Sequence, residues 1–125
     1  MSSGVFNTPE AKRAGGILSI DLDALVGNWQ RYADAVRPSG SEAAAVVKAQ
    51  SYGLDAAHVA PALARAGCKT FYVASIDEGI ALRTVLGSVP AIHVFNGVMD
   101  GAEREFTTHG LVPVLNSLAE VDAWR

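Results

Sequence analysis

Short runs of apolar residues alternate with amphipathic stretches over most of the chain, and this alternation predicts an α/β fold. The runs are continuously apolar, which is typical of strands that are covered on both faces. The runs span residues 43–48, 70–75, 91–95 and 111–116, and the expected helices span 58–66, 77–86, 100–109 and 118–125. Strand and helix in this order indicate right-handed crossovers and a parallel sheet.

The segment that precedes these units has a different character. Residues 1–16 contain Ser, Gly and Thr without an apolar run, and we expect them to form a disordered leader. Residues 17–21 have the β-branched, alternating character of a short strand. Asp23 is expected to cap a helix over residues 24–36, which has one apolar face.

Two architectures fit this pattern of elements. One is the first half of a (β/α)₈ barrel, a fold that typically needs about 250 residues. The other is a small, complete, doubly wound sheet. The last helix presents Leu118, Val121 and Trp124 on one face and breaks off at Arg125 without a Gly or Pro stop. This ending indicates truncation, but the periodicity alone leaves both architectures open.

Composition and charge exclude several classes of function. The formal net charge of −3 gives no basic field for a phosphate backbone, so nucleic acid is not an expected partner. Cys68 stands alone, which indicates neither a disulfide framework nor a CxxC metal site, and we expect no metal. No apolar run is long enough for a secretory signal or a membrane helix. We therefore expect a soluble, cytoplasmic protein.

The residues best suited to carry chemistry follow the first apolar run. Lys48 ends that run at the carboxyl edge, where barrels and open α/β sheets place their active sites. A lysine in such a place can have its pKa lowered by desolvation, which makes the amine a nucleophile. Tyr52 could direct its hydroxyl into the same pocket, and Gly53 permits a sharp turn. On physical grounds alone, a lysine that reaches solvent and a half-buried tyrosine are the commoner case.

Other polar residues have simpler interpretations. The three histidines lack the spacing of metal ligands, and His93, within an apolar run, is expected to be a core residue. Asp21 reads as a strand-end residue. Asp77 and Glu78 begin a helix, where acidic side chains complement the helix dipole.

Three motifs resemble those of the alanine racemase family. Residues 45–53, A-V-V-K-A-Q-S-Y-G, resemble the motif to which that family attaches its cofactor. Residues 19–28 resemble its opening I-D-L-x-A-L-x-x-N, and residues 71–83 resemble F-x-V-A-x-x-x-E-[AG]-x-x-L-R. The motifs occur in the family's order and spacing, and the similarity runs from about residue 17 to the last residue.

This resemblance implies an α/β fold that is the first half of a (β/α)₈ TIM-type barrel, formed by residues 17–125 and truncated. It implies pyridoxal 5'-phosphate as the cofactor, carried by Lys48 as an aldimine, with Tyr52 bonded to the cofactor phosphate. Residues 17–21 would join a C-terminal β domain that is absent here.

The resemblance also implies an activity. Members of the family interconvert L-alanine and D-alanine and so supply D-alanine for cell-wall peptidoglycan. Lys48 would be the base that acts on D-alanine. A tyrosine of a partner subunit would act on L-alanine, so a homodimer is expected for the full-length protein.

The chain departs from the motif at three positions, Gln50, Ser51 and Asp55, where the family usually has Asp or Asn, Ala and Gly. These changes are compatible with a divergent racemase or with another small amino acid as substrate. An acid at position 55 would be unfavourable if it pointed towards a phosphate. The second base and the phosphate-binding loop have no counterpart in these 125 residues, so we expect the chain alone to be inactive in a coupled D-alanine assay.

Two alternatives remain. A pyridoxal-phosphate-binding barrel protein of cofactor homeostasis shares a lysine at the end of its first strand, although the I-D-L-x-A-L opening favours the racemase. A receiver-like signalling module could use Asp21 and Asp23 as an acidic pocket. It would also need an acid and a lysine at later strand ends, where the chain has Asn96 and Asn116.

Overall fold

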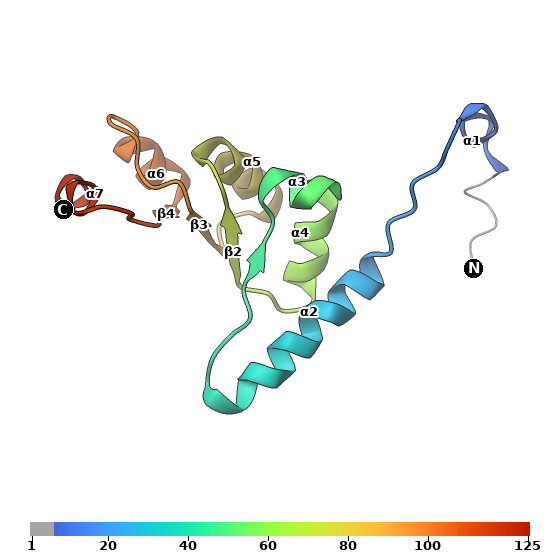
Figure 1. The fold of residues 1–125 in the computed structure, drawn as a ribbon, viewed down its shortest axis with the longest axis horizontal. Helices are drawn as coiled ribbons and strands as arrows, with labels where there is room; N and C mark the ends of the chain where they lie inside the picture. The colour runs from blue at the N-terminus through green and yellow to red at the C-terminus, as the bar shows by residue number, and fades with distance from the viewer. Residues whose placement is uncertain (1–6) are drawn as a thin grey trace.

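A parallel four-stranded sheet organises the structure, a computed structural model that describes residues 7–125 (Figure 1). Its strands lie in the order β1-β2-β3-β4, and every neighbouring pair is parallel. The strands are short and fall within the four predicted apolar runs: β1 (Ala45–Val46), β2 (Thr70–Val73), β3 (Ala91–Val94) and β4 (Leu111–Pro113). The prediction of a parallel α/β sheet is confirmed.

The strand order decides between the two predicted architectures. Each strand pairs with the one that follows it in the sequence, which is the winding of a barrel. A doubly wound sheet requires a point at which the order reverses, and residues 7–125 contain none. The receiver-like alternative is therefore wrong, since that fold needs the reversal.

Helices follow each strand, as the periodicity predicts, and additional short helices occur between the expected elements. Thr8, Asp21, Asp55, Ser75 and Ser117 each cap a helix through a side-chain oxygen. The helices are α1 (Pro9–Arg13), α2 (Leu22–Val36), the 3₁₀ helix η2 (Arg37–Ser39), α3 (Lys48–Gly53), α4 (Ala56–Arg65), α5 (Ile76–Leu86), α6 (Glu103–His109) and α7 (Leu118–Trp124).

The region before the sheet differs from prediction in two respects. Residues 17–21 form no strand, because no strand of the described chain pairs with them. The cap of α2 is Asp21, whose Oδ1 accepts from the backbone N–H of Ala24 at 2.9 Å, whereas Asp23 lies in the first turn. Of the expected leader, residues 1–6 lie outside the described part, and α1 forms within the remainder, with no buried residue.

Within residues 7–125 the helices cover one face of the sheet. Phe71 and Ile92 are fully buried on the covered face, in a core completed by residues of α4, α5 and α6. The next row in register is Val46, Tyr72, His93 and Val112, and Val46 and Val112 are 41% and 42% exposed. A sheet with helices on one face is what a segment of barrel wall presents.

His93 lies on the face that the described helices leave uncovered, which is the face that a closed barrel turns inward. It is half-buried and its ring stacks on Tyr72, with ring centroids 4.7 Å apart. Tyr72 stacks in turn on Phe95 at 4.9 Å. The apolar neighbours of His93 in the sequence, Ile92 and Val94, point to the opposite face, which the continuous apolar run concealed.

No helix among the described residues is both long and apolar enough to cross a membrane.

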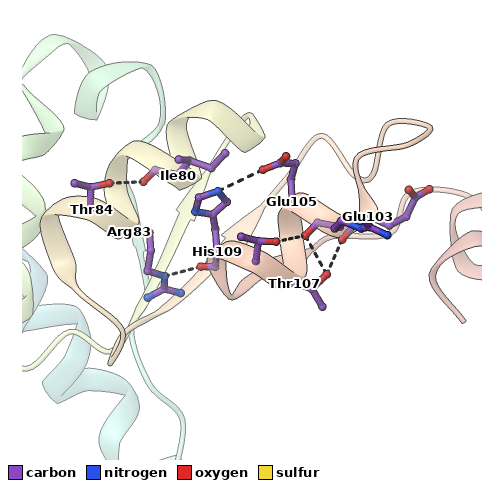
Figure 2. Close-up of polar contacts among 9 residues, drawn as sticks. Ile80, Arg83, Thr84, Glu103, Glu105, Thr107 and His109 are labelled. Atoms are coloured by element: carbon purple, nitrogen blue, oxygen red, sulfur yellow. Dashed lines mark hydrogen bonds and ion pairs between the residues drawn. The ribbon is translucent and has the colours of Figure 1, made fainter.

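Arg83 of α5 joins the loops that lead into β3 and β4, and Figure 2 shows its bond to the His109 carbonyl. Its Nε and Nη2 donate to the carbonyls of His109 and Gly110 at 2.9 and 2.6 Å. Its Nη1 donates to the carbonyls of Gly87 and Pro90 at 2.9 and 2.7 Å. Burial lowers the pKa of Arg83, yet an arginine in a protein stays charged. One guanidinium therefore donates hydrogen bonds to four carbonyls in the segments that precede two strands.

We expect Arg83→Lys to destabilise the chain by about 2 kcal/mol, because an ammonium cannot present donors to carbonyls on two loops at once. The urea midpoint of unfolding measures this loss. Arg65→Lys is the matched control, since Arg65 is exposed on α4. Equal midpoints for the two variants would show that the guanidinium geometry contributes nothing.

Candidate active site

The candidate site lies where the chain leaves β1. Val47 is 3% exposed, and its N–H donates to the Tyr72 carbonyl at 2.9 Å, so the ladder extends one residue beyond the strand. Lys48 comes next and is half-buried. The predicted strand runs through Lys48, whereas the observed strand ends at Val46 and Lys48 begins α3. The lysine nevertheless lies at the carboxyl edge of the sheet.

After Lys48 the backbone winds in the left-handed sense. Ala49, Gln50, Ser51 and Tyr52 have φ between 49° and 56° and ψ between 37° and 49°. Left-handed backbone costs an L-residue roughly 1–2 kcal/mol, and it seldom occurs in consecutive residues. A bond from the Ser51 N–H to the Val47 carbonyl, at 3.0 Å, closes the turn. Strain held beside a candidate nucleophile supports a functional role for the turn.

Glu78 holds the start of this left-handed turn from another element. Its Oε1 accepts from the Ala49 N–H at 2.8 Å, and its Oε2 accepts from the Ala74 N–H at 2.8 Å. Ser75 and Glu78 also form a capping box at the start of α5. The prediction gave Glu78 only a role at the helix dipole. The S-x-x-E spacing of residues 75–78 indicates the capping box, but the bond to Ala49 depends on the fold.

Lys48 and Tyr52 lie on the same turn, and both have unoccupied polar groups. Within residues 7–125, no hydrogen bond or ion pair engages the Lys48 ammonium or the Tyr52 hydroxyl. Tyr52 is 65% exposed and borders an open, mainly apolar hollow of about 290 Å³. Leu25 and Trp29 of α2 line the same hollow. Lys48 is not among the described residues that line this hollow, so the amine and the phenol share a turn without facing one common cavity.

Asp55, which departs from the family motif, turns away from this site. Its φ of 68° lies in the region that favours glycine, the residue usual in the family. Its Oδ1 accepts from the Ala57 N–H at 3.0 Å as the cap of α4, and its Oδ2 lies 2.7 Å from His58 Nδ1. The bond with His58 lowers the pKa of Asp55. The unfavourable inward orientation considered for this acid does not occur.

Taken together, these features define a class: a segment of parallel barrel wall that presents a lysine and a tyrosine on one strained turn. The family model described as "Alanine racemase, N-terminal domain" matches residues 20–125, and the chain belongs to this family. The predicted resemblance and fold class are confirmed.

Individual relatives agree with this assignment. The chain is 49% identical over 112 residues to a catabolic alanine racemase of Mesorhizobium japonicum, covering 90% of the chain and 29% of that protein. It is 45% identical over 112 residues to the alanine racemase of Rhodospirillum rubrum, covering 90% of the chain and 30% of that protein. The chain therefore spans less than a third of the length of these relatives.

Two solved structures have the same fold. The alanine racemase from Bartonella henselae with covalently bound pyridoxal phosphate has a TM-score of 0.80 and 43% sequence identity, covering 84% of this chain and 29% of that one. The alanine racemase from E. faecalis has a TM-score of 0.76 and 30% identity, covering 84% and 28%.

We expect Ser51→Ala to stabilise the chain by about 1 kcal/mol. The Ser51 hydroxyl is buried, at 4% exposure, and has no hydrogen-bond partner among the described residues. Alanine removes this unsatisfied group and keeps the same Cβ in the left-handed turn. The urea midpoint should rise for this variant and stay unchanged for the control Ser88→Ala, in an exposed loop. A lower midpoint for Ser51→Ala would contradict the description of the Ser51 hydroxyl as buried and unsatisfied.

Proposed function

We propose that this chain is the N-terminal barrel portion of a pyridoxal-phosphate-dependent alanine racemase, with residues 17–125 as the barrel segment and Lys48 as the cofactor lysine. The observation that carries the proposal is the half-buried Lys48 at the carboxyl edge of β1, its amine unpaired within residues 7–125. The Bartonella henselae relative, at 43% identity, carries pyridoxal phosphate covalently.

The residues of the turn fit this cofactor. A primary amine forms a covalent bond to an aldehyde, and the Lys48 amine is available for it. The Tyr52 hydroxyl can donate to a phosphate oxygen, and its side chain is exposed above the same edge. Ala49, the residue after Lys48, is small and exposed, which leaves space beside the amine.

When bound, the cofactor acts as an electron sink that acidifies the Cα proton of an attached amino acid. With the cofactor bound, the Lys48 amine would be the group of this chain that takes or returns that proton. The left-handed turn fixes the backbone on which Lys48 stands. Tyr52 would keep the phosphate in place and thereby the orientation of the reacting carbon.

The proposal extends to the whole protein of which this family domain is a part. Its substrate would be alanine, interconverted between the L and D forms, and its product D-alanine would serve cell-wall peptidoglycan. We also propose that the whole protein is a cytoplasmic homodimer whose partner subunit supplies the second base. The names of the relatives, all alanine racemases, support this activity over cofactor homeostasis.

Incubation with pyridoxal phosphate followed by borohydride reduction should label Lys48 in preference to the other two lysines, Lys12 and Lys69. Both of these are exposed, so they report ordinary surface reactivity. Peptide mapping by mass spectrometry measures the label at each site. Lys48→Arg should remove the preferential label, and Lys69→Arg should leave it intact. Label spread evenly over the three lysines of a folded sample would refute the proposal.

A further inference from the structure

The Glu78 carboxylate bridges the lysine-bearing turn and the turn that follows β2. We propose that Glu78 is a positioning residue for Lys48: it fixes the peptide that joins Lys48 to Ala49 and so sets the direction in which the lysine leaves the strand. The role assigned to Lys48 rests on the proposed function, whereas the bridge itself rests on geometry alone.

The peptide group bonded to Glu78 is the one that follows Lys48. The N–H of Ala49, which donates to Glu78 Oε1 at 2.8 Å, belongs to the Lys48–Ala49 peptide. A bond to this group restrains ψ of Lys48 and φ of Ala49. The left-handed backbone begins at Ala49, whose φ is 49°, whereas Val47 has already left the extended region, with a ψ of 23°. The peptide before Lys48 is also held, since its Val47 carbonyl accepts from the Ser51 N–H at 3.0 Å, and with both flanking peptides fixed the Cα–Cβ direction of Lys48 is fixed.

The bridge requires a carboxylate at position 78. Oε1 serves Ala49, while Oε2 accepts from the N–H groups of Ala74 at 2.8 Å and Ser75 at 3.4 Å. Every one of these partners is a donor, so both oxygens must be acceptors. A glutamine has one acceptor oxygen and one donor NH₂ group. It can serve Ala49 or the turn after β2, but not both.

Glu78 is itself held in place by helix α5. The capping box with Ser75 fixes its backbone, and the start of α5 favours a negative charge. Helix α5 is packed closely against the sheet, since a Cβ at Gly79 would lie 3.0 Å from Leu111 Cδ1. Leu82 on the same helix is 3% exposed. The carboxylate thus connects the strained turn to a rigid support.

The turn after β4 has a similar arrangement of a capping serine and a glutamate three residues later. Ser117 caps α7 through a bond from the Glu120 N–H at 3.2 Å, and Glu120 Oε2 accepts from the Asn116 N–H at 3.0 Å. The Glu120 carboxylate lies against Gly97, in the loop after β3, and leaves no room there for a Cβ. Both glutamates therefore reach back to the preceding loop, but only Glu78 reaches a loop with a lysine.

The test compares Glu78→Gln with the matched control Asp77→Asn in the 125-residue chain. Both remove one negative charge from the first turn of α5, and the Asp77 side chain makes no hydrogen bond within residues 7–125. Two readouts are needed: amide hydrogen exchange at Ala49, read by NMR, and the rate of pyridoxal phosphate labelling at Lys48 relative to Lys69. For Glu78→Gln we expect Ala49 exchange to accelerate and the relative labelling rate to fall, each roughly tenfold. Asp77→Asn should change neither.

The unmodified chain offers a test that does not depend on the folding of a variant. The Ala49 amide should exchange roughly tenfold more slowly than that of its exposed neighbour Gln50, for which the turn provides no acceptor. Equal exchange at the two amides would overturn the proposal.

The two proposals fail in different ways. Rapid labelling of Lys48 in Glu78→Gln, with Ala49 still protected, would overturn the positioning role and leave the cofactor assignment standing. Conversely, even labelling of all lysines in the unmodified chain would refute the cofactor role of Lys48. Slow Ala49 exchange in that chain, and its acceleration in Glu78→Gln alone, would then still support the bridge.

Discussion

Burial of one face of the sheet is the constraint on which the remaining structure depends. Phe71 and Ile92 are fully buried against α4, α5 and α6, and at about 25 cal/mol per Å² such side chains each contribute on the order of 2 kcal/mol. Parallel pairing places all four carboxyl ends along one edge, and burial of this face holds the paired strands in place. The position of Lys48 follows from that alignment.

Strain at the site is tolerated because the surrounding structure determines it. The left-handed turn of residues 49–52 is opposed by sterics at each residue. It begins next to the buried Val47, is closed by the Val47 carbonyl and is held by Glu78 on α5. Each of these anchors belongs to the folded sheet. The geometry around Lys48 is therefore a property of the tertiary structure rather than of the motif alone.

Much of the fold could be predicted because local sequence and tertiary structure agree. The continuous apolar runs and the glycines at residues 67, 87 and 110 locate strands and helix ends closely. The stacking of His93 on Tyr72 could not be read from the runs, since His93 is the one polar residue in its strand and pairs with Tyr72 only across the sheet. The strand over residues 17–21 failed because a strand needs a partner, and the described chain supplies none.

The candidate site was predicted less completely than the fold. The position of Lys48 and Tyr52 at the end of the first strand follows from the run of residues 43–48, which ends at the lysine. The left-handed backbone could not be foreseen, because Ala, Gln, Ser and Tyr have no preference for it. The role of Asp55 was likewise hidden, since a cap is evident only once the start of α4 is known. Contacts between distant segments carry this missing information.

Helix α5 shows how stability and function are divided along one element. Glu78, in its first turn, bonds the lysine-bearing turn at the carboxyl edge of the sheet. Arg83, five residues later, saturates carbonyls at the amino ends of β3 and β4. In barrels the carboxyl edge carries the chemistry and the amino edge carries stability. Since one rigid helix holds both edges, loosening the Arg83 end would also loosen the support of Glu78. Glu78 and Arg83 therefore hold the two edges of the same sheet from opposite ends of α5.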